Sequence, residues 1–415
     1  MKRVVITGLG AITPIGKNVK QYWENLLKGI SGANKITRFD ASKFKTQFAC
    51  EIKDYDALDY FDRKEARKLD RFSQYGLISA KEAIKDANLD FSKLDTNRIG
   101  VIFSSGIGGF ETFEKEIIDY TNGNFNPRFN PFFIPKIISN GLSGIISINN
   151  GLRGVNYCPV TACASSTQSI IQSFNYIRLG KADIIIAGGS EAPITESSIG
   201  GFNAMKAMST NNENFSSASK PFDTNRDGFV VGEGAGALII ESLDSALKRN
   251  ANIYAEIVGG GESSDAYHIT GTHPEGLGAY LAMENGIKEA KITPNEIEYI
   301  NAHATSTGLG DLSEIKAIER LFKSSIEKVQ ISASKSMTGH LLGGTGAIEA
   351  ISTCLSVKTD LIPPTINTTE IDKNIPKELN LSLGETSSKK VNYALSNSFG
   401  FGGHCSAMIL KKYVG

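Results

Sequence analysis

The sequence Val160-Thr161-Ala162-Cys163-Ala164-Ser165-Ser166-Thr167 carries the strongest structural signal in the chain. An apolar stretch precedes Cys163, and the pattern of a helix follows it. Beyond it, the apolar residues fall on one helix face, at Ile170, Ile171, Phe174 and Ile177. Gly180 then supplies a stop signal. The stretch predicts a turn into a helix over 165–179, with the Cys163 thiol at the helix N-terminus.

Short runs that are almost wholly apolar lie on both sides of this helix in the sequence, at 3–6, 99–103, 184–187, 238–240 and 297–300. Such runs are typical of strands that are covered on both faces. A second helical pattern covers 346–357, where Ile348, Ile351 and Leu355 share one face. The alternation of strands and helices predicts an α/β protein with a largely parallel sheet.

The pattern restarts near residue 250. The charged segment 243–252 has the character of a helix ending, and 253–261 then repeats the order of 4–10, an apolar strand followed by glycines. We therefore expect two related halves, 1–250 with the cysteine and 251–415 with two histidines and a glycine-rich turn.

Charge and composition exclude several classes of function. Lys plus Arg and Asp plus Glu both number 44, so the net charge is zero, and we expect neither a nucleic-acid coat nor a polybasic membrane anchor. No stretch has the composition of a membrane helix. Five scattered cysteines without a CxxC pair predict a reduced, cytoplasmic protein.

Glycine is abundant, at 42 residues, but the nucleotide-binding motifs G-x-G-x-x-G and Walker A are missing from the sequence. The segment 223–228 imitates the start of a calcium loop. Its twelfth position is Gly234 rather than a bidentate Glu, so we expect no metal site there.

Cys163 is the candidate nucleophile. Free N–H groups and the positive dipole end at a helix N-terminus stabilise a thiolate, so its position predicts a lowered thiol pKa. The alternative is a small buried hydrophobic residue, the usual fate of a cysteine.

Two histidines each lie past the carboxyl end of a predicted strand: His303 is in the segment directly after 297–300, and His340 is in the segment 335–340 that follows 329–332. Open α/β sheets build ligand sites at the carboxyl ends of strands. The segment 397–403 is a glycine-rich turn between two predicted strands, 393–396 and 406–410. It is either a plain hairpin loop or a set of backbone N–H groups presented to an oxyanion.

Together these motifs resemble the β-ketoacyl-acyl carrier protein synthases of the thiolase superfamily, elongating class II type, over essentially the whole chain. Further matching segments are 4–10, 188–191, 221–228 and 263–268. The resemblance implies a thiolase-like, duplicated αβαβα fold of five layers and a homodimer. It implies no bound cofactor, since the substrates are carried on the 4′-phosphopantetheine of acyl carrier protein.

The resemblance also implies roles in a decarboxylative Claisen condensation. Cys163 would hold the acyl chain, and its own N–H and that of Phe401 would bind the oxyanion. His303 and His340 would hold the enolate formed from the malonyl group. Lys335 and Glu314 would order the site electrostatically.

Other residues take their implied roles from the motifs alone. The residues implied to contact the pantetheine are Thr305 and Thr307. Those implied to form the gate, the acyl pocket and the tunnel are Ile107, Phe202, Phe399 and Phe401, and Phe133 would reach the tunnel from a partner subunit. The residues implied to dock the acidic carrier protein are Lys64, Arg67, Lys68, Arg128 and Lys206; the alternative for these is a solvated helix face.

This chain departs from the family pattern at Ala304, at 343–346 and at His404-Cys405. Three alternatives therefore stay open. One is a ketosynthase of a polyketide or polyene pathway. Another is a non-catalytic chain-length partner that forms a heterodimer, although such partners lack the nucleophile. The third is a thiolase, which would use a second cysteine near the place of Cys405.

Overall fold

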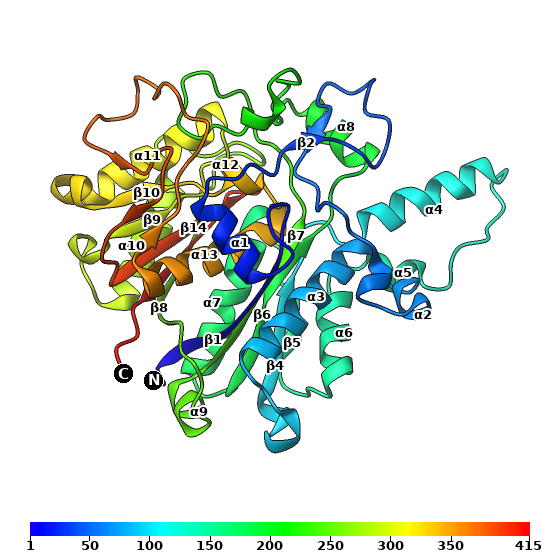
Figure 1. Ribbon diagram of the computed structural model, residues 1–415, viewed down its shortest axis with the longest axis horizontal. Helices are drawn as coiled ribbons and strands as arrows, with labels where there is room; N and C mark the ends of the chain where they lie inside the picture. Colours follow the sequence, from blue (N-terminus) through cyan, green and yellow to red (C-terminus); the bar gives the residue numbers. More distant parts are fainter.

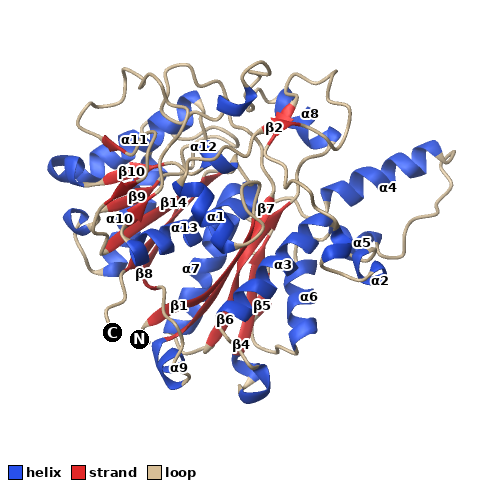
Figure 2. Cartoon of the chain, in the orientation of Figure 1, coloured by secondary structure: helices blue, strands red, loops and turns tan.

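The computed structural model describes the backbone of residues 1–415 and every side chain except that of Ser324. One large sheet runs through the molecule (Figures 1 and 2). Its strands are β1 (Val4–Ile12), β4 (Ile99–Ser104), β5 (Asn156–Tyr157), β6 (Ile184–Glu191), β7 (Gly234–Ser242), β8 (Ala255–Ser264), β9 (Tyr299–Asn301), β10 (Gln330–Ser332), β12 (Asn380–Leu381), β14 (Tyr393–Gly400) and β15 (His404–Lys411). Two small sheets pair β2 (Asn34–Lys35) with β3 (Phe48–Ala49), and β11 (Leu361–Ile362) with β13 (Ser387–Ser388).

The order in the large sheet is β12-β10-β9-β14-β15-β8-β1-β7-β6-β4-β5. Outward from the central β1–β8 pair, both directions give two antiparallel pairings followed by parallel ones, two on the β1 side and three on the β8 side. The same topology therefore occurs twice, which confirms the duplicated fold.

The expectation of a largely parallel sheet was wrong, because five antiparallel pairings join the six central strands from β14 to β6. The tight turn between β14 and β15 shows the reason. Strands joined by a hairpin of three residues can only run antiparallel, whereas parallel neighbours need a long crossover.

The helices are α1 (Val19–Leu27), α2 (Arg63–Ala66), α3 (Arg71–Asp86), α4 (Phe110–Asn122), α5 (Phe133–Ile137), α6 (Gly141–Asn150), α7 (Ser165–Arg178), α8 (Glu196–Ala204), α9 (Leu243–Lys248), α10 (Leu277–Ala290), α11 (Gly308–Phe322), α12 (Lys335–Thr338) and α13 (Thr345–Thr359). Helices α7 and α13 pack between the two halves of the sheet, α3 and α6 cover one outer face, and α10 and α11 cover the other. Three apolar cores fill the spaces between these layers.

The two helices predicted from apolar spacing are confirmed as α7 and α13. Helix α7 buries Ile170, Ile171, Phe174 and Ile177, as expected of its apolar face. Helix α13 is buried on all sides from Thr345 to Val357, because it lies at the centre of the molecule. Among the described residues, no helix combines the length and apolar character needed to cross a membrane.

Candidate active site

Cys163 lies in a 3₁₀ turn, Ala162–Ala164, immediately before helix α7. The turn is strained, since Ala162 has φ of 49°, in the left-handed region that residues with a side chain rarely adopt. The glycine-rich turn after β14 approaches it closely. A Cβ on Gly400 would stand 2.5 Å from the carbonyl oxygen of Thr161 and 2.9 Å from the backbone nitrogen of Cys163, so only glycine fits there.

The expectation of a lowered Cys163 pKa was wrong. Burial raises the pKa of the thiol to about 12, although the charge of Lys335 and the backbone N–H groups of Phe401 and Cys163 act in the opposite direction. Desolvation of a thiolate outweighs these stabilising groups, because only 8% of the residue is exposed. The backbone N–H groups of Phe401 and Cys163 both act on the thiol, and their role as an oxyanion site stays a prediction.

His303 and His340 come together although 37 positions separate them in the sequence. Their ring centroids lie 5.4 Å apart, with the planes at 85°. His340 Nδ1 lies 3.0 Å from the hydroxyl of Thr345, which begins α13. His303 packs against Phe399 on the adjacent β14, at 5.5 Å between centroids, and its Nδ1 has no protein partner.

Both imidazoles are held neutral at pH 7. Burial lowers the pKa of His303 and of His340 well below the ordinary value of 6.5, and the positive charge of Lys335 acts in the same direction. A neutral imidazole carries one N–H and one lone pair, so each ring can donate a single hydrogen bond.

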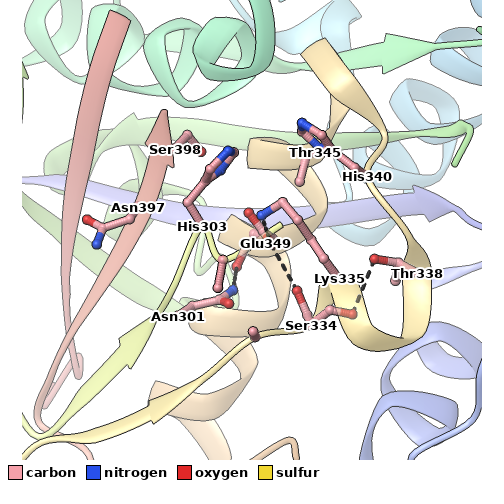
Figure 3. Close-up of polar contacts among 12 residues, drawn as sticks. Asn301, His303, Ser334, Lys335, Thr338, His340, Thr345, Glu349, Asn397 and Ser398 are labelled. Carbon is pink, nitrogen blue, oxygen red and sulfur yellow. Dashed lines mark hydrogen bonds and ion pairs between the residues drawn. The ribbon is translucent and has the colours of Figure 1, made fainter. Parts of the chain in front are cut away.

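Lys335 forms a buried ion pair with Glu349, with 2.6 Å between Nζ and Oε1. Figure 3 shows this pair beneath the two histidine rings. Ser334 also donates to Glu349 Oε1 at 3.1 Å. Burial raises the pKa of Glu349, and the contact with Lys335 offsets part of that rise. The acidic partner of Lys335 is thus a residue of α13 that the motifs did not single out.

Glu314, for which the resemblance implied an ordering role, contacts the His303 segment through the backbone. Its carboxylate accepts from the N–H groups of His303 at 2.9 Å and of Ala304 at 2.8 Å. Asn397 donates its side-chain N–H to the same carboxylate at 2.9 Å. Helix α11 therefore fixes the His303 segment against β14. Ala304 supplies only its N–H here, so its departure from the family pattern leaves this contact intact.

Glu191, at the end of β6, connects the Cys163 side of the site with the segment after His340. Its carboxylate accepts from the N–H groups of Gly106, Ile107 and Gly343, at 2.8, 3.2 and 2.9 Å. Burial raises the pKa of Glu191 to about 7. The loop that carries Ile107 is thereby joined to the 3₁₀ turn Leu342–Gly344.

One cavity of about 640 Å³ collects most of the predicted site residues. Those that line it are Cys163, His303, His340, Thr305, Thr307, Ile107, Phe202, Phe399, Phe401 and Lys206. Lys335 and Glu314 lie behind the lining, nearly fully buried. Cys405 also faces this cavity, whereas its neighbour His404 is exposed.

The other predicted residues lie outside the cavity of the single chain. Phe133 stacks on Phe129 of the segment between α4 and α5, at 5.4 Å between centroids. Lys64, Arg67, Lys68 and Arg128 are exposed. Lys68 Nζ lies 5.6 Å from the centroid of the Phe132 ring, so the residues just after α2 contact the segment between α4 and α5.

Sequence reasoning missed Glu349, Asn397 and the role of Glu191. Glu349 had a visible signal, since it is the only charged residue in the apolar run 345–357. A lone charge in a buried helix needs a partner. In the part of the chain that the structure describes, no group of three or more His, Cys, Asp or Glu side chains is placed to hold a metal ion.

One cavity of a duplicated α/β fold thus brings together a strained turn with a thiol, two neutral imidazoles and a buried ion pair. Family models match the chain: the β-ketoacyl synthase N-terminal domain matches residues 1–246, and the C-terminal domain matches 254–369. The chain belongs to the β-ketoacyl synthase family and is a condensing acyltransferase. That membership speaks against the thiolase alternative.

Among the relatives, the 3-oxoacyl-[acyl-carrier-protein] synthase 2 of Staphylococcus aureus (strain COL) is 48% identical over 415 residues, covering 99% of both chains. The protein of the same name from Synechocystis is 45% identical over 413 residues, covering 99% of this chain and 98% of its own. Among solved structures, a type II polyketide ketosynthase in complex with its acyl-carrier protein superposes with a TM-score of 0.92. It is 32% identical and covers 99% of this chain and all of its own.

Proposed function

We propose that this chain is an elongating 3-oxoacyl-acyl carrier protein synthase of fatty-acid synthesis, which extends an acyl chain held on Cys163 by two carbons from malonyl-acyl carrier protein. The observation that carries the proposal is one cavity in which Cys163, His303 and His340 meet above the Lys335–Glu349 pair. The names of the relatives that match over the full length agree with it.

Acylation is the first step. The Cys163 sulfur attacks the thioester carbonyl of the acyl-carrier protein, a C–S bond forms, and the tetrahedral oxyanion lies between the N–H groups of Cys163 and Phe401. The old C–S bond then breaks, and the carrier thiol leaves with the proton that Cys163 gives up. Backbone donors of this kind typically contribute 10²–10³-fold in rate.

Condensation follows once the acyl chain is on Cys163. The malonyl group loses CO₂, and the electron pair of the broken C–C bond forms an enolate at the thioester. His303 and His340 each donate one N–H to the enolate oxygen, which neutral imidazoles can do. When Thr345 donates to His340 Nδ1, the His340 proton stays on Nε2. The enolate carbon attacks the acyl-Cys163 carbonyl, and the Cys163 thiolate leaves.

Substrate contacts follow from the lining of the cavity. The hydroxyls of Thr305 and Thr307 lie 3.1 Å apart at its wall and hold the pantetheine arm. Ile107 and Phe202 line the part that takes the acyl chain, and Phe399 and Phe401 lie at the approach to Cys163.

The partner that delivers both substrates is an acidic acyl carrier protein. Lys64, Arg67, Lys68, Arg128 and Lys206 are all exposed and available to its surface. Lys206 also lines the cavity, so it marks where the carrier would meet the opening. Binding should weaken as salt rises, because exposed charges are screened beyond about 10 Å at 0.1 M ionic strength.

We place a homodimer interface on α4, α5 and the segment between them; α4 and that segment project from the body of the molecule (Figure 1). This arm exposes Phe113, Ile117, Ile118, Phe125, Phe129, Phe132, Ile134 and Ile138. An exposed apolar group of this size is typical of a protein interface. Phe133 is part of the arm, so a second copy could bring it to the cavity. Sedimentation velocity of Phe129→Ser should show monomers where the unchanged chain shows dimers.

The halves divide at 250/251, between helix α9 and strand β8, and no free cofactor takes part. A cytoplasmic location is supported by five cysteines that are all free.

A ketosynthase of a polyketide pathway is the second candidate, supported by the TM-score of 0.92 to a polyketide enzyme. Sequence identity favours fatty-acid synthesis, because it is 48% to the Staphylococcus aureus synthase and 32% to the polyketide ketosynthase. The deciding experiment offers purified enzyme a series of acyl-carrier proteins of rising chain length with malonyl-carrier protein, and products are read by mass. A single two-carbon extension of saturated chains supports the proposal; repeated extension without reduction supports the polyketide alternative.

A further inference from the structure

The segment 221–228, whose residues 223–228 imitate the start of a calcium loop in sequence, lies against the turn that carries Thr305 and Thr307. Its two ends hold Ser306: the N–H of Lys220, just before the segment, donates to the Ser306 hydroxyl at 3.0 Å, and the N–H of Gly228 donates to the Ser306 carbonyl at 3.1 Å. Ser306 has φ of 67°, a conformation that a serine keeps only when its surroundings impose it.

Arg226 makes the central contacts between the two segments. Its Nε donates to the carbonyl of Thr307 at 3.0 Å and its Nη2 to the carbonyl of Gly308 at 2.8 Å. Its Nη1 donates to the Asp223 carbonyl at 2.6 Å and the Asp372 carboxylate at 2.9 Å. The planar guanidinium thus fixes two successive carbonyls with donors held in a rigid fork, a geometry that the flexible ammonium of a lysine does not reproduce.

The position of this cation runs against a local electrostatic rule. Thr307 is the N-cap of α11, and a positive charge at a helix N-terminus is unfavourable. Only 2% of the Arg226 side chain is exposed, so solvent does not screen it. Asp311, in the first turn of α11, lies 3.5 Å from Arg226 and accepts from the N–H of Thr307 at 3.2 Å. Such violations of a local rule, offset by neighbouring charges, concentrate at functional sites.

We propose that Arg226 is a positioning residue for the carrier-bound substrate: it holds the Thr305–Thr307 turn in the shape that receives the pantetheine arm. This inference rests on the proposed pantetheine contacts of Thr305 and Thr307. Arg226 acts through the backbone of that turn, and its side chain stays in its buried ion pairs.

The test compares two acyl donors with the same acyl chain. One is the acyl-carrier protein, and the other is an aryl thioester, which has no pantetheine arm. Arg226→Gln should raise the KM for the acyl-carrier protein about tenfold and leave Cys163 acylation by the aryl thioester within about twofold. Arg226→Lys should behave like Arg226→Gln, because it keeps the charge and loses the double carbonyl contact.

Arg249→Gln is the matched control. Arg249 also pairs with a buried carboxylate, Glu241, and donates to a main-chain carbonyl, that of Ala87, but it does not line the cavity. It should lower thermal stability about as much as Arg226→Gln and leave the KM unchanged. Two results would overturn the inference. One is a KM for the acyl-carrier protein that rises in Arg226→Gln but is normal in Arg226→Lys. The other is an equal loss of Cys163 acylation with the acyl-carrier protein and with the aryl thioester.

A second pair of variants separates this inference from the proposed function. Thr305→Val with Thr307→Val should raise the KM for the acyl-carrier protein, and adding Arg226→Gln should raise it little further, since coupled residues are not additive. If the threonine variants raise the KM and Arg226→Gln does not, only the inference about Arg226 fails. If the threonine variants leave the KM unchanged, the proposed pantetheine contacts fail and the inference fails with them.

Discussion

The ammonium of Lys335 lies 2.6 Å from the carboxylate of Glu349, with 1% and 0% of the two side chains exposed, below the rings of His303 and His340. Neither charge has access to water. Each partner therefore depends on the other, and the two histidines lie in the field of the pair.

Breaking this pair should destabilise the protein strongly. Lys335→Met or Glu349→Leu alone leaves one buried charge without its partner, which costs about 3–5 kcal/mol in comparable proteins. The double variant removes both charges and should recover most of that loss in urea unfolding. It should not recover condensation, because the field at the histidines is gone. A double variant that condenses at the original rate would contradict the role of the pair.

The buried histidines should make stability depend on pH. Their folded pKa values lie well below 6.5, so below that pH the unfolded chain binds more protons than the folded one. The free energy of unfolding should then fall by up to about 1.4 kcal/mol per histidine per pH unit as the pH drops.

The control for this effect is His303→Gln with His340→Gln, measured by urea unfolding at several pH values. Burial raises the pKa of Glu191 to about 7, so this carboxyl stabilises the folded state as the pH falls below 7 and opposes the histidines. The variant keeps that carboxyl. The difference between the two proteins therefore isolates the histidines, and identical pH profiles would show that their pKa values are not lowered.

Gly400→Ala should slow acylation of Cys163. The added Cβ would meet Thr161 and Cys163 backbone atoms within 3 Å, so the turn must move and carry the N–H of Phe401 away from the sulfur. We expect a loss of about 10²–10³-fold in acyl-enzyme formation, the typical effect of losing one oxyanion donor. Gly144→Ala in α6 is the control, since a Cβ there meets no atom within 4 Å and should leave acylation unchanged.

Alkylation of Cys163 by iodoacetamide should keep accelerating through alkaline pH. With burial raising the thiol pKa to about 12, the thiolate fraction grows roughly tenfold per pH unit up to pH 10 and beyond. Peptide mass mapping assigns the modified residue, and Cys163→Ser removes the signal. A rate that reaches a plateau below pH 8 would show instead that the helix N-terminus controls the pKa.

Much of the fold was predictable because apolar spacing reports burial directly. The face of α7 and the apolar runs of β4, β6 and β7 lie where the sequence indicated. Strand direction was not predictable, because an apolar run has the same composition in a parallel and an antiparallel sheet.

The site was predictable in part. Cys163, His303 and His340 each follow a strand or precede a helix, so local patterns identified them. The Lys335–Glu349 pair depends on α12 and α13 packing together, and no motif links those two residues. The raised pKa of Cys163 comes from burial, to which β14 and the turn after it contribute. These residues are far from Cys163 in the sequence, so the position of the thiol at a helix N-terminus did not predict the effect.

The most direct test of the proposed chemistry is mass spectrometry of the enzyme after incubation with acyl-carrier protein, with and without malonyl-carrier protein. We predict an acyl adduct on Cys163 in the unchanged chain, none in Cys163→Ala, and an adduct without 3-oxoacyl product in His303→Ala and His340→Ala. An acyl adduct that persists in Cys163→Ala would contradict the assignment of the nucleophile.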